Sequence, residues 1–186
     1  MFTKESLPLI ICLVTVLATV IGWFVSHRLA HNTQLRKDRL ELVNRQLAEF
    51  YGPLHIACVV GSAAYDALSA KLGRHTIFEA NKPLTDSEFR EWFHWMKYVF
   101  MPLNVIREKI VLKKLHLLIG PEAPKEIREF ASHVAGYRAL LAKWENGDFT
   151  EQASLFDFPD GLGAYAEKSF AQLKEEQERL IGALKK

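Results

Sequence analysis

Residues 7–25 read LPLIICLVTVLATVIGWFV, an uncharged stretch that governs how the rest of the chain is organised. At about 1.5 Å of rise per helical residue it extends roughly 28 Å, close to the thickness of the hydrocarbon core of a bilayer. Trp23 and Phe24 lie near its end, where amphipathic rings favour the membrane interface. We therefore predict that residues 1–25 form an N-terminal tail and a transmembrane anchor, which contacts the lipid bilayer through residues 7–25.

A cleaved signal peptide is the competing interpretation of this stretch. Its apolar region would be shorter, about 7–15 residues, and a small-x-small cleavage site would follow it. Here the apolar run is longer, and Ser26-His27-Arg28 follows it. Both differences favour an uncleaved, single-pass anchor.

The charges that flank the anchor predict its orientation. Before it, Lys4 and Glu5 cancel each other, whereas basic residues predominate after it. Because positively charged flanks stay in the cytoplasm, we expect the N-terminus outside and the C-terminal domain in the cytoplasm. The basic residues that follow the anchor are Arg28, Arg36, Lys37, Arg39 and Arg45.

The composition limits the class of protein. The chain has 186 residues, of which 49% are hydrophobic and 25% charged, with a net charge of +2. This balance is typical of one globular domain and excludes a multi-span membrane protein. A charge of +2 gives no electrostatic reason to expect a nucleic acid as partner. Two cysteines, Cys12 and Cys58, exclude a disulfide framework.

The periodicity after the anchor is helical throughout, and no segment alternates with period two over the length of a strand. Residues 26–53 are predicted to be a juxtamembrane helical stalk that ends in a kink at Gly52-Pro53, because proline removes a backbone donor and crowds the preceding turn. These two residues are a candidate hinge. The apolar seam of the stalk is Leu40, Val43, Leu47, Phe50 and Leu54, at 3-4 spacing.

Residues 54–186 are predicted to form a cytoplasmic bundle of four or five helices, so the fold class is all-α. Thr85 and Glu88 have the spacing of a capping box that begins a helix. Pro102 lies inside the helical pattern that follows, which is therefore one long helix or two. Pro124 opens the next helix, and residues 146–162 form a long loop before the last one. The expected core stripe after Thr85 is Phe89, Trp92, Met96, Val99, Leu103, Ile106 and Ile110.

A basic face is one candidate ligand-binding site. Lys109, Lys113 and His116 have helical spacing in the predicted third helix. Such a stripe could hold a phosphate or a nucleotide messenger. A solvated helix face, or attraction to anionic lipid headgroups, explains the same spacing.

His133 is a second candidate, because Glu129 and Tyr137 lie four residues on either side of it. A row of carboxylate, imidazole and phenol could orient a proton donor for a hydrolase, or it could only fix helix packing. His27 and His31 share a helical face but have no carboxylate or cysteine near them in the sequence, so we expect no metal. No nucleophile motif or phosphate-binding loop is present, and no cofactor is expected.

Several segments resemble a widespread group of small uncharacterised bacterial membrane proteins with a single span. Residues 46–54, QLAEFYGPL, follow the span as they do in that group. The resemblance implies a bacterial inner-membrane protein and supports the anchor and the all-helical fold, but it assigns no active-site residue. The other similar segments are Pro102-Leu103-Asn104, residues 133–137, and Trp144 followed by Gly147-Asp148-Phe149.

Together these patterns favour a non-enzymatic, membrane-anchored module that acts through protein contacts, as a homo-oligomer or with another membrane protein. The alternative is a ligand-gated membrane effector, for example in anti-phage defence, that senses an anionic small molecule near Lys109, Lys113 and His116. In that alternative Gly52-Pro53 transmits the change to the span.

Overall fold

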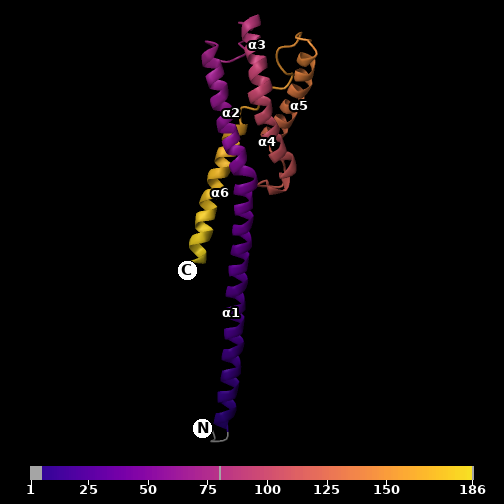
Figure 1. Ribbon diagram of the computed structural model, residues 1–186. Coiled ribbons are helices and arrows are strands. Elements are labelled where there is room, and N and C mark those ends of the chain that lie inside the picture. The colour runs from indigo at the N-terminus through magenta and orange to yellow at the C-terminus, as the bar shows by residue number, and fades with distance from the viewer. Residues whose placement is uncertain (1–5, 80, 186) are drawn as a thin grey trace. The chain divides into compact units, whose positions relative to one another are not determined.

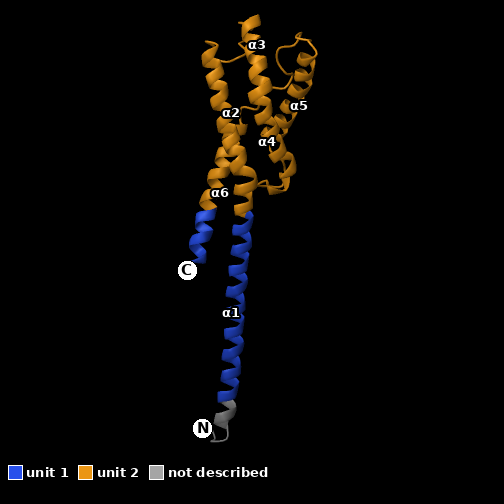
Figure 2. Cartoon of the chain, in the orientation of Figure 1, with its two compact units in different colours: residues 1–42, 177–186 blue, residues 43–176 orange. Residues whose placement is uncertain are grey.

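The computed structural model describes residues 6–79 and 81–185, with side chains described from residue 11 onward (Figure 1). Lys4 and Glu5, whose charges entered the predicted orientation, lie outside the described residues. The chain divides into two compact units (Figure 2). Unit 1 comprises residues 1–42 and 177–186, and unit 2 comprises residues 43–176.

The predicted all-α fold is confirmed, and the described residues contain no β-strand, only an isolated bridge between Glu79 and Lys82. The capping box at Thr85 is present, and Pro124 directly precedes a helix, as predicted. The α-helices are α1 (Ser6–Gln46), α2 (Gly52–Lys71), α3 (Asp86–Trp95), α4 (Met101–Lys113), α5 (Lys125–Glu145) and α6 (Leu162–Leu184), with π-helical turns η1 (Leu47–Tyr51) and η2 (Met96–Phe100) and a 3₁₀ turn η3 (Leu115–Leu117).

Within unit 1, α1 carries the apolar stretch that the sequence assigns to the membrane. A helix that begins in this stretch is long and apolar enough to cross a membrane, and its apolar window is not buried within the protein. Every side chain from Ile11 to Val25 is exposed. Exposure of so many large apolar side chains is costly in water and is the normal state of a helix in lipid.

The chain stays helical through Gly52-Pro53, where the sequence predicted that the stalk ends in a kink. A π-helical turn, η1, joins α1 to α2, and the Gly52 N–H donates to the Leu47 carbonyl five residues earlier. The proline has no N–H to contribute, and the wider π turn relieves the crowding of its ring against the preceding turn. Glycine is required beside it, because a Cβ on Gly52 would lie 2.5 Å from the Leu47 oxygen.

Pro102 is accommodated in the same way. Turn η2 joins α3 to α4, the Met101 N–H donates to the Met96 carbonyl, and Pro102 lies in the first turn of α4. The helical segment from residue 86 to residue 113 is therefore continuous, so the sequence pattern that contains Pro102 forms one long helical segment.

The π turn η2 also corrects the predicted core stripe. Phe89, Trp92 and Met96 are buried as expected, but the exposed or half-exposed residues include Val99 within η2 and Leu103, Ile106 and Ile110 beyond it. An additional residue in the turn rotates the following helix by roughly 100°. As a result, the buried residues of α4 are Met101, Asn104, Arg107 and Val111.

The core of unit 2 lies between α2, α4 and α5, and α4 packs against each of the other two (Figure 1). Val43, Leu47, Phe50 and Leu54 are buried, so this part of the predicted seam belongs to the core. The beginning of α6 packs near η1, where the hydroxyls of Tyr51 and Tyr165 lie 2.9 Å apart.

Substitution of Gly52 tests the π turn. Gly52→Ala places a methyl group against a backbone oxygen that cannot move aside, so we expect unfolding to be easier by about 1–3 kcal/mol. The measurement is thermal unfolding of the full chain in detergent, followed by tryptophan fluorescence. Gly163→Ala is the control, because nothing lies within 4 Å of its added Cβ. Equal stability of the two variants would contradict the assignment.

Candidate functional site

A buried arginine lies where α2 and α4 pack together. The Arg107 side chain is only 3% exposed. One of its terminal nitrogens donates to Asn104 Oδ1 at 2.7 Å, and the other donates to the Ala57 carbonyl of α2. Its guanidinium carbon lies 5.8 Å from the centre of the Phe158 ring, in cation–π geometry. Arg107 thus joins three segments that are distant in sequence: α2, α4 and the loop before α6.

Gly61 makes room for this guanidinium. A Cβ built on Gly61 would lie 1.9 Å from Arg107 Nη2 and 3.0 Å from Cζ. Any larger residue at position 61 would therefore displace a buried charge. Gly61 thus lets a side chain of α4 approach the backbone of α2 closely.

No carboxylate of the described residues pairs with Arg107, which is unusual for a buried charge. Burial lowers the pKa of the Arg107 guanidinium, although the group stays protonated, and burial raises the pKa of the neighbouring Cys58 thiol. A protonated, buried thiol is a poor nucleophile. The arrangement supports packing and gives no route for a reactant to reach these groups.

His133 anchors the loop of residues 146–161 to α5. Its ring is 5% exposed, and the Nδ1 nitrogen lies 2.9 Å from the Phe156 carbonyl, which accepts the hydrogen bond. The ring also meets Phe158 edge-on, with centroids 5.2 Å apart. Burial lowers the pKa of His133 most strongly, while its contacts with Phe156 and Asp157 oppose that shift.

The predicted row of Glu129, His133 and Tyr137 is only partly assembled. His133 and Tyr137 are in ring contact at 4.8 Å, and both are buried. Glu129 is instead exposed and pairs with Lys125 at 3.3 Å. Burial also raises the pKa of Tyr137, so this phenol holds its proton. Two of the three residues therefore form a packing contact, and the carboxylate that would orient the imidazole faces away.

The loop of residues 146–161 runs along α5 and is held there at several points. The Trp144 Nε1–H donates to the Glu151 carbonyl at 2.7 Å. A Cβ on Gly136 would lie 2.3 Å from Ser154 Oγ, so glycine permits the close approach of the loop. Two phenylalanines of the loop pack on the helices: Phe149 on Phe89 and Phe93, and Phe158 on Phe130.

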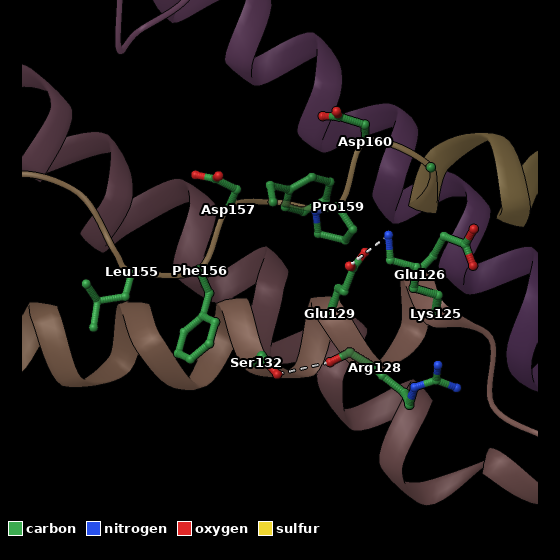
Figure 3. Close-up of a pocket in the computed structure, with 12 residues that line it drawn as sticks. Lys125, Glu126, Arg128, Glu129, Ser132, Leu155, Phe156, Asp157, Pro159 and Asp160 are labelled. Atoms are coloured by element: carbon green, nitrogen blue, oxygen red, sulfur yellow. Dashed lines mark hydrogen bonds and ion pairs between the residues drawn. The ribbon is translucent and has the colours of Figure 1, made fainter. Parts of the chain in front are cut away.

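A hollow of about 670 Å³ lies between this loop and the start of α5 (Figure 3). Phe156 points toward α5, while Asp157 points away from it (Figure 3). The charges around the hollow are mixed and partly satisfied within the protein, as in the Lys125–Glu129 pair. Its lining therefore does not define a class of ligand. The charged and hydroxyl residues that line it are Lys125, Glu126, Arg128, Glu129, Ser132, Asp157 and Asp160.

The predicted basic face is divided by the end of α4. Lys109 and Lys113 are exposed and lie one turn apart on α4. His116 is also exposed but belongs to the separate 3₁₀ turn η3, so it does not continue that face. None of the three lines the hollow near α5. Within residues 6–79 and 81–185, no group of three or more histidine, cysteine or acidic residues is placed to hold a metal ion.

Comparison of the chain with protein-family models, curated proteins and solved structures finds no match. The function proposed for the protein therefore rests on its own residues.

Two surfaces that sequence reasoning missed are the outer faces of α2 and α4, which carry exposed apolar side chains. For α2 a signal was available, because a helix with almost no polar face must be covered on more than one side. For α4 the helical spacing of apolar residues gave the wrong inner face, because η2 shifts the buried positions of the helix by one residue.

The lowered pKa of His133 predicts how stability depends on pH. Since the pKa of His133 in the folded state lies below the ordinary value of 6.5, the unfolded state binds more protons than the folded state below that pH. The contribution of neutral His133 is therefore complete above pH 6.5 and is lost as the pH falls. We expect the wild type to lose on the order of 1 kcal/mol between pH 7 and 5.5, and His133→Gln to lose less.

The measurement is chemical unfolding of the full chain across this pH range. His75→Gln is the matched control, since His75 is exposed. Identical pH profiles for the wild type and His133→Gln would show that the ring is not held neutral by the fold.

Proposed function

We propose that this protein is a single-pass, membrane-anchored helical module without enzymatic activity, which acts through protein contacts and self-associates through α2. The observation that carries the proposal is the outer face of α2. Ile56, Val59 and Val60 are 57%, 48% and 47% exposed, and Ala63 and Ala67 continue this face along the helix. We call these five residues the α2 face.

The α2 face is distinct from the side of α2 that packs in the core. Ala57, Cys58, Gly61 and Leu68 are buried and follow the inner side of the helix. The outer residues follow the opposite side at 3-4 spacing, so α2 has an apolar strip on two sides, and its exposed polar residues Ser62 and Asp66 lie between them. A contiguous exposed apolar strip of this kind marks an interaction surface.

A second copy of the chain is the partner that suits this surface. None of the five residues is charged, and the exposed carboxylate next to them, Asp66, lies at the edge of the α2 face rather than within it. In a two-fold dimer the same patch meets itself, and apolar residues are self-complementary. Ala63 and Ala67 would let the two helices approach closely. Anchoring in a membrane would raise the effective concentration of the copies.

We propose further that the chain is a bacterial inner-membrane protein, with its N-terminus outside and unit 2 in the cytoplasm. The basic residues after the apolar stretch support this orientation. The resemblance of residues 46–54 to bacterial single-span proteins supports the proposed location in the inner membrane.

Reporter fusions test the orientation. A fluorescent protein that matures only in the cytoplasm should fluoresce when fused after Lys186, and alkaline phosphatase at the same position should be inactive. Replacing four basic residues with glutamine should weaken the preference for a cytoplasmic C-terminus. These residues are Arg28, Arg36, Lys37 and Arg39. The control carries four such changes at basic residues beyond residue 80. An active phosphatase fusion on the wild-type chain would contradict the proposed orientation.

Charge placed on the α2 face tests self-association. Val59→Glu and Ile56→Glu would each bury a carboxylate in an apolar contact, so we expect the oligomer to dissociate at least tenfold more readily. The measurement is the mass of the full chain in detergent, by light scattering over a concentration series. Leu155→Glu is the control, because Leu155 is 90% exposed and lies outside the α2 face.

A mass that stays monomeric at every concentration would refute self-association. The same series with added nucleotides tests the ligand-gated alternative. A change of mass caused by a nucleotide, and lost in Lys109→Glu, would favour that alternative.

A further inference from the structure

The outer face of α4 is a second unpartnered surface, and it differs in character from the α2 face. Val105, Ile106 and Leu112 are exposed there, with Leu112 at 63%. Lys109 and Lys113 are exposed on the same side of the helix. We call these five residues the α4 face.

The α4 face does not belong to the core. The inner side of α4 is formed by Asn104, Arg107 and Val111, which are buried against α2 and α5. On one edge of the face, Glu108 pairs with Arg138 of α5 at 2.6 Å. The exposed apolar residues therefore lie on the side directed away from both neighbouring helices, where nothing in the described chain covers them.

The two lysines are available for an external partner. No hydrogen bond or ion pair joins Lys109 or Lys113 to a carboxylate within the described part of the chain. The adjacent Lys114, by contrast, pairs with Glu49. Lys109 lies between Ile106 and Leu112 in the sequence and around the helix axis. Its positive charge is therefore flanked by apolar side chains.

We infer that the α4 face binds an acidic amphipathic helix of a partner protein. An apolar stripe on that helix would contact Val105, Ile106 and Leu112. Two carboxylates one turn apart would match Lys109 and Lys113, which have the same spacing. A helix that packs along the α4 face would use apolar anchors at i, i+3, i+4 and i+7, with flanking charges that give specificity.

A protein partner suits the α4 face better than a lipid surface does. A helix that lies in the membrane interface keeps its lysines at the edges of the apolar side, where they reach the headgroups. Insertion of the α4 face would carry the Lys109 ammonium toward the hydrocarbon together with Ile106 and Leu112, which is costly. A carboxylate from a protein can instead meet this ammonium directly.

The test uses the full chain in nanodiscs of zwitterionic lipid and three synthetic helical peptides of about six turns. The first has a leucine stripe with two glutamates one turn apart. The second has lysines in place of the glutamates, and the third keeps the glutamates but has serines in place of the leucines. We expect the first peptide to bind at least tenfold more tightly than the other two, as measured by fluorescence anisotropy.

Variants of the protein locate the contact. Lys109→Glu with Lys113→Glu should weaken binding of the first peptide about tenfold and strengthen binding of the second. Leu112→Ser should weaken binding of the first peptide without strengthening binding of the second peptide. The matched control is Arg90→Glu with Lys168→Glu, which makes the same change of net charge at exposed residues of α3 and α6. This control should leave all three affinities unchanged.

Three results would overturn the inference. The first is equal binding of all three peptides, or none. The second is equal loss of binding in the control variant. The third is binding to vesicles of anionic lipid that disappears in the double lysine variant while the acidic peptide does not bind. Because none of these measurements involves the α2 face, their failure would leave self-association untouched, and Val59→Glu should not alter peptide binding.

Discussion

The buried guanidinium of Arg107 connects three segments of unit 2. It donates to a backbone carbonyl of α2 and to Asn104 of its own helix, and it lies against Phe158 of the loop before α6. Other features follow from its position. Gly61 must lack a side chain, and the loop must keep Phe158 over the charge. His133 then fixes the backbone of the same loop through Phe156. A buried cation with neutral partners gives specificity of packing rather than much net stability.

The two π turns have a common cause and different effects. Each precedes a proline near the start of a helix, and each lets a continuous helix pass a residue that would otherwise break it. At η1 the buried stripe passes through with Phe50 and Tyr51 both in the core. At η2 the stripe moves by one residue, so α4 directs Asn104 and Arg107 inward and leaves Ile106 exposed. The burial of Asn104 and Arg107 and the exposure of the α4 face thus both result from the geometry of η2.

Much of the fold could be predicted because its signals are local. The capping box at Thr85, the proline before α5 and the apolar stretch of α1 each depend on a few adjacent residues. Arg107 could not be recognised, since its role depends on a carbonyl of Ala57, fifty residues away in the sequence. In the sequence Arg107 stands close to Lys109 and Lys113, whereas the structure buries Arg107 and leaves the two lysines exposed. Proline signals also mislead in a particular way: they indicate a break, and a π turn satisfies the same constraint without one.

A π turn is a helical turn that holds one additional residue. The turn η2 therefore determines which side chains of α4 face outward. If residues 96–100 formed ordinary α-helix with every residue kept, everything beyond them would turn by roughly 100°. Leu103, Ile106 and Ile110 would then face α2, and Arg107 would leave the core. An apolar helix interior and a charged one therefore differ only in the hydrogen-bonding pattern of one turn, so a change confined to that turn could exchange a binding face for an ordinary core without any substitution in α4.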